Sequence, residues 1–228
     1  MKLINRRWAL TITGLFSCFV FVASANTLKY NQNNFRKAKE FNQKIDFENP
    51  DNNLLNIAIF FVTNEQRVAN KLQALKHNIA LENSAKMHAE SMLSFNFMDH
   101  INKFEPDKRT PDQRATKNNI SNPYIAENIA RVFGMQYISG KKIYIHGHRL
   151  YSYQASNPKF IEPHSYLSFA ENVVKGWMQS KGHRKNILST DAIELGCYAL
   201  LYFDKNFHDF PTFICVQNFQ FFEPIVQH

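Results

Sequence analysis

Glycine and proline are scarce in this chain of 228 residues, with seven and eight copies respectively. This composition excludes a collagen-like protein and a chain made of flexible linkers. It also leaves few residues for glycine-rich loops that cradle phosphates, and no P-loop or dinucleotide-binding fingerprint occurs. The HExxH and GxSxG motifs are likewise missing, so the common zinc protease and esterase classes lack sequence support.

The charge balance is mildly basic. The chain has 27 basic and 19 acidic residues, which gives a formal net charge of +8. These charges are scattered rather than arranged in a stripe, and this pattern favours a soluble surface over nucleic-acid binding. With 44% hydrophobic residues, the chain has enough apolar material for a core, and its length suits about one domain.

The first 25 residues have the pattern of a signal peptide. Three basic residues precede an apolar run from Trp8 to Val22, and Ala23-Ser24-Ala25 then supplies a signal peptidase site. We predict that residues 1–25 are removed and that the protein is secreted, periplasmic or extracellular. An uncleaved anchor is the alternative, but the run is shorter than the roughly 20 residues that a bilayer requires. No transmembrane segment is expected after cleavage.

Cleavage lowers the formal charge to +5, because it removes three basic residues and no acidic one. It also leaves two of the three cysteines, Cys197 and Cys215. An even pair in an oxidising compartment suggests one disulfide. The sequence does not give the Cα separation that such a bond requires, so the pairing stays open.

Composition separates a leader from the periodic part of the chain. Residues 26–53 are rich in Asn, Gln, Lys and Glu and predict a solvated polar leader. From Asp51, a suitable N-cap, apolar residues recur at helical spacing over 54–75 and predict a helix. A second helix is predicted over 81–92 on the same grounds.

The next segments predict mixed structure. Residues 102–123 read as a loop with a short helix opened by Thr110, and a further short helix is expected to start within 126–132. Two strand-like runs, 193–203 and 212–222, predict an antiparallel hairpin.

Residues 135–166 interrupt the regular apolar spacing of the rest of the domain and predict an accessory segment. This segment is expected to contain a hairpin that turns at Gly140. Ser168 and Glu171 have the spacing of a capping box at the start of an apolar helical face. Gly182 is expected to end that helix, since glycine accepts the left-handed conformation.

Three polar clusters stand at the ends of apolar segments. They are Phe97-Met98-Asp99-His100, Ala126-Glu127-Asn128-Ile129-Ala130 and the run 177–188, which contains Gly182-His183. In this order they resemble the signature elements of the CAP superfamily: cysteine-rich secretory proteins, antigen 5, pathogenesis-related proteins and bacterial SCP-like relatives. The resemblance covers about 54–222, and this range is the expected domain.

The resemblance implies an α+β fold, a three-layer α-β-α sandwich with a central antiparallel sheet. It also implies a cleft where His100, His183 and Glu127 meet. Imidazole nitrogens and a carboxylate are ligands that zinc accepts. The resemblance therefore implies a divalent metal such as zinc at these three residues, and no other cofactor is expected.

Other polar residues have simpler interpretations. Glu171 is a further cleft candidate by resemblance, but its capping position accounts for it without a function. Glu65 is expected to pair with a local donor, and His88 to pack beside the core. His146 and His148 would share a metal if they lay on a strand, but an exposed loop is the expected position.

By resemblance, the function is that of an exported protein that binds a small apolar ligand such as a lipid, or a partner protein; the fold does not select between these. The competing hypothesis is a metal-assisted, protease-like hydrolase that uses Glu127 as general base. Because the sequence contains no recognisable nucleophile motif, we favour binding over catalysis. A third hypothesis is a surface protein that makes contacts through 135–166.

Overall fold

A central sheet organises the computed structural model, which describes residues 29–222. The predicted signal peptide thus lies outside the described residues. The sheet has the strand order β1-β5-β6-β2, and its two inner strands form the predicted antiparallel hairpin. β2 pairs antiparallel with β6, whereas β1 adds a two-residue parallel pair at the other edge. The strands are β1 (Lys76–His77), β2 (Ile125–Phe133), β5 (Ala192–Asp204) and β6 (Phe210–Phe221).

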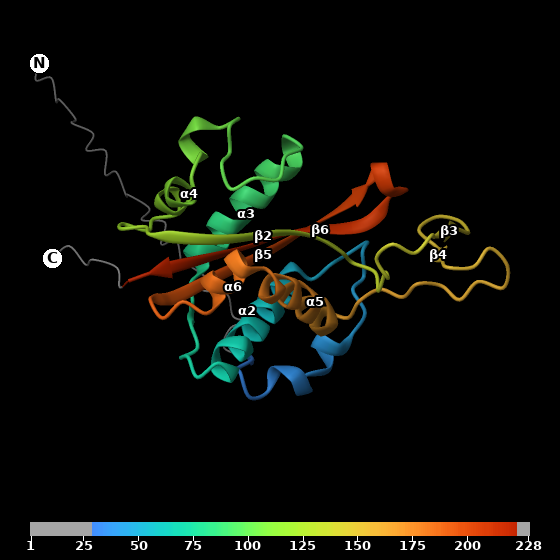
Figure 1. Cartoon of the computed structure of the whole chain (residues 1–228), viewed down its shortest axis with the longest axis horizontal. Helices are drawn as coiled ribbons and strands as arrows, with labels where there is room; N and C mark the ends of the chain where they lie inside the picture. Colours follow the sequence, from blue (N-terminus) through green and yellow to red (C-terminus); the bar gives the residue numbers. More distant parts are fainter. Residues whose placement is uncertain (1–28, 223–228) are drawn as a thin grey trace, which may run out of the picture.

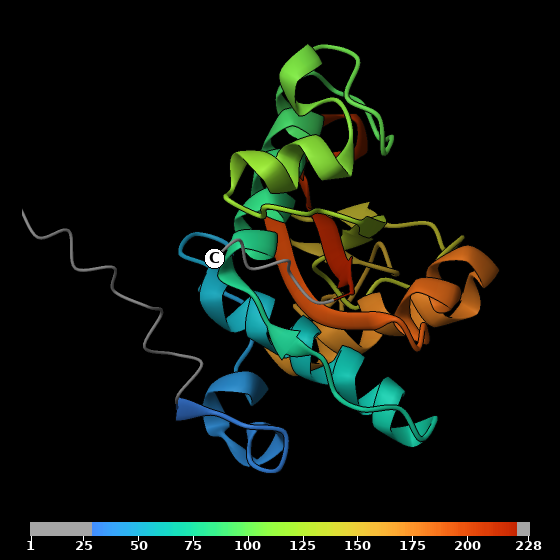
Figure 2. The same cartoon turned by 90° about the vertical axis from the view of Figure 1, so that its left-hand side faces the viewer.

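Helices cover both faces of this sheet. Figure 1 shows α3 and α4 on one face and α2, α5 and α6 on the other, and Figure 2 shows the same layers from the side. The predicted three-layer α-β-α sandwich is therefore confirmed. Within residues 29–222, none of the helices combines the length and apolar character needed to cross a bilayer. The helices are α2 (Asn52–Ala69), α3 (Ile79–Ser94), α4 (Pro111–Lys117), α5 (Tyr166–Gln179) and α6 (Lys181–Ile187).

Local capping sets the start of the predicted helices. The Asp51 carboxylate accepts a hydrogen bond from the amide of Leu54, and Asn78 caps α3 in the same way. Thr110 and Gln113 bond reciprocally at the start of α4, which confirms the predicted helix there. In each of these three helices, the side chain of the N-cap residue accepts hydrogen bonds from backbone amides of the first turn and so sets the start of the helix.

Two sequence expectations around α5 and α6 are wrong. The N-cap of α5 is Ser165, which bonds reciprocally with Ser168, so Glu171 plays no part in the capping box. The helix ends before Ser180, whose extended backbone separates α5 from α6. Gly182 therefore lies inside α6 rather than at a helix stop.

The segment 126–132 is a strand, not the expected helix. It pairs with β6 along its whole length, and its side chains alternate between the two layers. Ala126 and Ala130 pack against the core under α2 and α5, whereas Ile129 packs against the core under α3. Pairing with β6 overrides the helical preference of alanine and glutamate.

The polar leader is packed from Tyr30 onward, contrary to expectation. Two short 3₁₀-helices, η1 (Phe35–Lys37) and η2 (Lys39–Asn42), place Phe35 and Phe41 in the main core with no exposed surface. The surrounding Asn and Lys residues stay on the surface. The burial of Phe35 and Phe41 therefore attaches the leader to the domain, although most of its other residues are polar.

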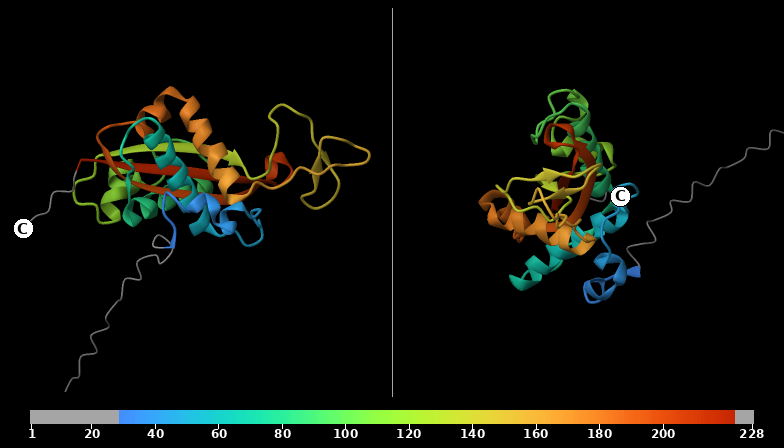
Figure 3. Two further views of the ribbon diagram at one scale, coloured as in Figure 1. Left: turned by 90° about the horizontal axis from the view of Figure 1, so that it is seen from below. Right: turned by 90° about the vertical axis from the view of Figure 1, so that its right-hand side faces the viewer.

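The segment 135–166 forms its own two-stranded sheet. β3 (Tyr144–Ile145) pairs with β4 (Tyr151–Ser152), so the hairpin turns around Gly147 instead of Gly140. Figure 3 shows this segment extending from one end of the central sheet. It is nevertheless attached by packing, because Tyr151 is fully buried against Phe210 at the start of β6.

Cys197 and Cys215 are both buried and free. Cys197 pairs with Gln217 across the hairpin, and Cys215 pairs with Ala199, so the two cysteines are not opposite each other. Burial raises the pKa of both thiols. Each is therefore a small apolar core residue in this structure.

Candidate functional site

The candidate site is built on β2, which lies at an edge of the sheet. Because side chains alternate along a strand, Glu127 faces the α3–α4 layer and Asn128 faces α6. The outward carbonyls of β2 are also satisfied: Asn186 donates to the carbonyl of Glu127, and Trp177 donates to that of Ile129. Groups from both helical layers thus converge on one edge strand.

The carboxylate of Glu127 is the centre of the site, and it is fully engaged. Oε1 accepts a hydrogen bond from His100 Nδ1 at 2.9 Å and lies 3.6 Å from His88 Nε2. Oε2 accepts from Arg114 Nη2 at 2.8 Å. In the amide orientation that satisfies its neighbours, Asn218 donates to the same oxygen at 3.1 Å. Only 1% of the Glu127 side chain is exposed.

Arg114, on α4, joins this carboxylate to the loop that carries His100. Its side chain is completely buried and donates to the carbonyls of Lys108, Arg109 and His100 as well as to Glu127. The guanidinium therefore fixes the loop backbone and supplies the counter-charge of the buried carboxylate.

These contacts set the ionisation of Glu127. Burial alone would raise its pKa, since an apolar environment disfavours the charged form. The hydrogen bond from His100 and the charge and hydrogen bond of Arg114 act in the opposite direction and hold the pKa below its usual value. Glu127 is thus an ionised, neutralised carboxylate.

His100 is the member of this cluster that faces solvent, with 45% of its side chain exposed. Because a carboxylate only accepts hydrogen bonds, the proton lies on Nδ1 and, in the neutral ring, Nε2 keeps a lone pair. The hydrogen bond to Glu127 raises the pKa of His100. Nε2 is therefore available for an external ligand.

His183 approaches from the opposite layer, on α6. Asn128 donates to its carbonyl and accepts from Asn186, which fixes this part of α6 against β2. Burial lowers the pKa of His183, and the charge of His100 lowers it further. The structure thus brings His100, His183 and Glu127 to one edge of the sheet, with His183 held in its neutral form.

His88 belongs to the scaffold, as expected. It is fully buried on α3 and donates from Nε2 to the carbonyl of Asp99 at 2.9 Å. Burial lowers its pKa, so the ring is neutral and Nδ1 has no partner among residues 29–222. Its hydrogen bond holds the backbone next to His100.

The other candidates lie elsewhere. Arg36 of the leader bridges Glu171 and Glu65, with hydrogen bonds of 2.5 to 2.6 Å. Both glutamates are therefore surface ion-pair partners on α5 and α2. His146 bonds to Ser152 within the accessory segment.

The side chains at the site limit how a metal ion could be coordinated. A metal ion at Glu127 would lie against the guanidinium of Arg114, and both carboxylate oxygens are already bonded. Within residues 29–222, no three His, Cys, Asp or Glu side chains form a group suited to a metal ion. The imidazoles of His100 and His183 remain as donors, with Glu127 orienting His100 as carboxylates orient metal-binding histidines.

The ring of His100 lies at the molecular surface. Five surface cavities between residues 29 and 222 have volumes from about 230 to 720 Å³, and none of these five is lined by His100, Glu127 or His183. The exposed ring of His100 is thus open to solvent and is not part of these five cavities.

Sequence reasoning missed the pairing of Arg114 with Glu127 and the amide cluster of Asn128, Asn186 and Gln217. The position of Arg114 in the short helix predicted after Thr110 was the available signal for the first. The amides gave no signal, because asparagine is abundant throughout this chain.

The chain shares its fold with a solved bacterial protein. It is 22% identical to an extracellular protein containing an SCP domain from Bacillus anthracis, with a TM-score of 0.50 over 75% of this chain. The match spans 41% of that longer protein. An outer surface protein of Borrelia burgdorferi is 19% identical, with 79% of this chain and 98% of that chain covered and a TM-score of 0.48.

A comparison with curated proteins yields no significant match. The model of the CAP family, described as the cysteine-rich secretory protein family, matches residues 60–219. This range contains the three polar clusters and the whole site on β2. The chain therefore belongs to the CAP family.

Proposed function

We propose that this protein is an exported CAP domain that binds a partner through the open edge formed by His100 and His183. The observation that carries the proposal is the hydrogen bond from His100 Nδ1 to the buried carboxylate of Glu127. It orients one exposed imidazole with Nε2 outward. The predicted signal peptide and the secretory description of the family support export.

The shape of the site favours a protein ligand over an enclosed lipid. A lipid chain needs an apolar chamber, and none of the five cavities described above is lined by His100 or His183. A divalent metal suits the same edge: His100 and His183 would hold it, and a group from the partner or water would complete the coordination. Such a metal would bridge this protein to its partner.

Glu127 serves this site as a positioning residue. A general base must lie within hydrogen-bond reach of the proton that it removes. Both oxygens of Glu127 are bonded and its side chain is closed to solvent. The binding function therefore fits the carboxylate better than the role of a base does.

The His100–Glu127 pair keeps the metal-assisted hydrolase as the second candidate. A histidine oriented by a carboxylate is the arrangement of a general base in many hydrolases. In that case Nε2 of His100 would accept the proton instead of holding a metal, which would leave His183 as the metal ligand, and Glu127 would stabilise the charged ring. Hydrolysis of a peptide substrate that is lost in His100→Ala would support this candidate over pure binding.

Calorimetric titration with zinc tests the metal part of the proposal. We expect about one ion per chain near neutral pH, loss of binding in His100→Ala and in His183→Ala, and 10- to 100-fold weaker binding in Glu127→Gln. Affinity should fall as the pH drops through the pKa of His100, which the hydrogen bond to Glu127 raises above its usual value, because protons compete for the imidazoles. The double variant His146→Ala/His148→Ala is the matched control. Unchanged affinity after loss of His100 and His183 would place the metal elsewhere.

A further inference from the structure

Arg67, near the C-terminal end of α2, is a buried cation without an anionic partner among residues 29–222. Only 2% of the residue is exposed. Its guanidinium holds together the loop after α2, the end of α6 and the start of β5. It donates to the carbonyls of Gln73, Ile187, Ser189 and Ala192, at 2.9, 2.8, 2.8 and 3.5 Å.

These acceptors occupy most of the hydrogen-bond donors of Arg67, but they do not compensate its positive charge. A guanidinium has five N–H donors, and the four bonds above leave one N–H of Nη2 without an acceptor among residues 29–222. All four acceptors are neutral carbonyls. A buried charge is costly unless an opposite charge lies beside it. An anion next to Arg67 would supply that charge.

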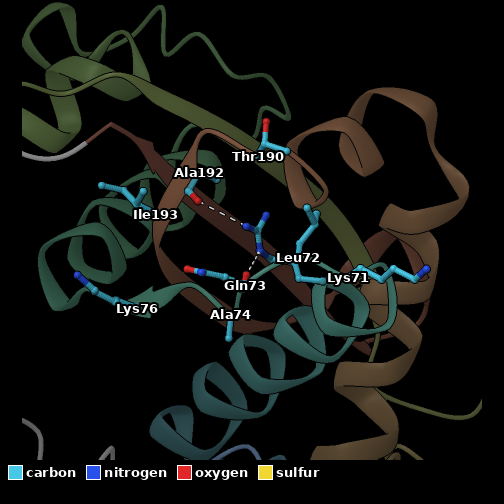
Figure 4. Close-up of a pocket in the computed structure, with 9 residues that line it drawn as sticks. Lys71, Leu72, Gln73, Ala74, Lys76, Thr190, Ala192 and Ile193 are labelled. Atoms are coloured by element: carbon cyan, nitrogen blue, oxygen red, sulfur yellow. Dashed lines mark hydrogen bonds between the residues drawn. The ribbon is translucent and has the colours of Figure 1, made fainter.

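A pocket of about 380 Å³ opens beside this guanidinium. Figure 4 shows Gln73 and Ala192 near the middle of the pocket, with Lys71 and Lys76 on opposite sides, their side chains extending outward, and Thr190 above them. Arg67 donates to the carbonyls of Gln73 and Ala192 and lines the same pocket. The residues that line the pocket include these three cations and no acid. Neither lysine has an ion pair within the described part of the chain, so both charges are available.

The neighbouring surface extends the positive field. A second cavity, of about 720 Å³, shares Thr190 with the first and is lined by Lys181, Arg184 and Lys185 of α6. Asp191 is the one acid among the residues that line it. Two adjoining hollows thus carry six cationic side chains, and such a field concentrates anions.

We propose that the pocket beside Arg67 binds a phosphate group. The charge selects phosphate over a carboxylate: a phosphate monoester has close to two negative charges near neutral pH, whereas a carboxylate has one. Arg67 supplies the fixed donor in the wall, and Lys71 and Lys76 neutralise the remaining charge. The pocket shares no residue with the His100–His183 site, so this inference stands apart from the proposed function.

Titration with inorganic phosphate at low ionic strength tests the site. We expect saturable binding that weakens about tenfold in the double variant Lys71→Asn/Lys76→Gln, because two charge-assisted contacts are lost. Asparagine suits position 71, where φ is 62°, since it tolerates the left-handed conformation. The fold should be unaffected, because Arg67 keeps its four carbonyl partners.

The control is Lys103→Asn/Lys175→Gln, which removes the same charge from exposed lysines outside both cavities. It should bind phosphate as the unaltered protein does. Equal weakening in both double variants, or no saturable phosphate binding at all, would overturn the site. Acetate at the same concentration should bind more weakly than phosphate, and equal binding would overturn the choice of phosphate.

Vesicles distinguish the two sources of a phosphate group. Phosphatidylcholine vesicles with and without phosphatidic acid are sedimented with each protein. Retention on the phosphatidic acid vesicles that is lost in Lys71→Asn/Lys76→Gln assigns the site to a lipid headgroup. Phosphate binding without vesicle retention assigns it to a free phosphate compound.

Discussion

Arg114 Nη2 lies 2.8 Å from Glu127 Oε2, and the two side chains are 0% and 1% exposed. This ion pair joins α4 to the edge strand β2, so it sets the distance between the loop that carries His100 and the sheet. It also takes one carboxylate oxygen out of any reaction. The other oxygen is then left to orient His100, whose exposed ring is the part of the cluster that a ligand can reach.

The first prediction is that Arg114→Met lowers the free energy of unfolding by about 3–5 kcal/mol, because it leaves the Glu127 carboxylate buried without a counter-charge. Urea unfolding measures the loss. Lys117→Met on the same helix is the matched control: its ion pair with Asp107 is exposed, so the cost should be within about 1 kcal/mol. Equal losses in the two variants would contradict the role given to Arg114.

The second prediction concerns the pKa of His100. The hydrogen bond to Glu127 raises this pKa, so Glu127→Gln should lower it toward or below 6.5. A raised pKa in the folded protein stabilises the fold at pH values below 6.5, and this contribution is lost as the pH rises through the pKa of His100. NMR titration of the ring protons measures the shift. An unchanged pKa of His100 in the variant would mean that the bond does not control this ring.

Local signals explain which elements were predictable. α2, α3 and α4 begin at Asp51, Asn78 and Thr110, whose side chains bond to amides within a few residues, so the sequence contains the whole cause. The sequence predicts a helix within 126–132, whereas this segment is a strand because it pairs with β6, about 90 residues further along the chain. No local pattern in 126–132 reports that pairing.

The site likewise has residues that the sequence identifies and contacts that depend on tertiary packing. His100, His183 and Glu127 could be selected through the resemblance of their surrounding motifs, and the structure brings them together. The ion pair with Arg114 depends on how α4 packs over β2, which spacing along the chain does not determine. The predicted zinc site stays a prediction. Glu127 bonds to Nδ1 of His100 in the structure.

The third prediction tests the packed leader. Phe41→Ala should cost about 3–5 kcal/mol, because Phe41 is fully buried in the main core and its ring meets Phe35 and Tyr30 edge-on. Lys37→Ala, at an exposed position of η1, should change stability by less than about 0.5 kcal/mol. Thermal or urea unfolding of both variants gives the comparison. A Phe41→Ala protein as stable as the Lys37→Ala protein would restore the interpretation of a solvated leader.

The fourth prediction uses two glycines with opposite surroundings. A Cβ at Gly196 on β5 would lie 2.1 Å from the amide nitrogen of Glu82, in the backbone of α3. Gly196→Ala should therefore destabilise by about 1–3 kcal/mol or more, because the helix must move off the sheet. Gly176 in α5 has open space around it, so Gly176→Ala should stabilise by about 0.5–1 kcal/mol. Chemical unfolding of both variants measures the two signs, and a tolerated Gly196→Ala would show that α3 does not contact β5 so closely.

The last prediction is an acid sensitivity that arises at His164, next to the N-cap of α5. Burial lowers the pKa of His164 to about 4, and the charge of Lys44 acts in the same direction. The unfolded chain binds a proton at this residue below about pH 6.5, whereas the folded protein does not. His164 therefore contributes stability above pH 6.5 that is lost as the pH falls toward 4.

His164→Gln removes this titration and keeps a polar group near Ser168, the hydrogen-bond partner of His164 Nδ1 at 3.0 Å. The variant should lose less stability than the unaltered protein between pH 7 and pH 4, as measured by urea unfolding at several pH values. His88 and His183 also have lowered pKa values, and their contributions cancel in this comparison because both proteins contain them. A stability difference between the two proteins that stays constant from pH 7 to pH 4 would show that His164 is protonated equally in the folded and unfolded states.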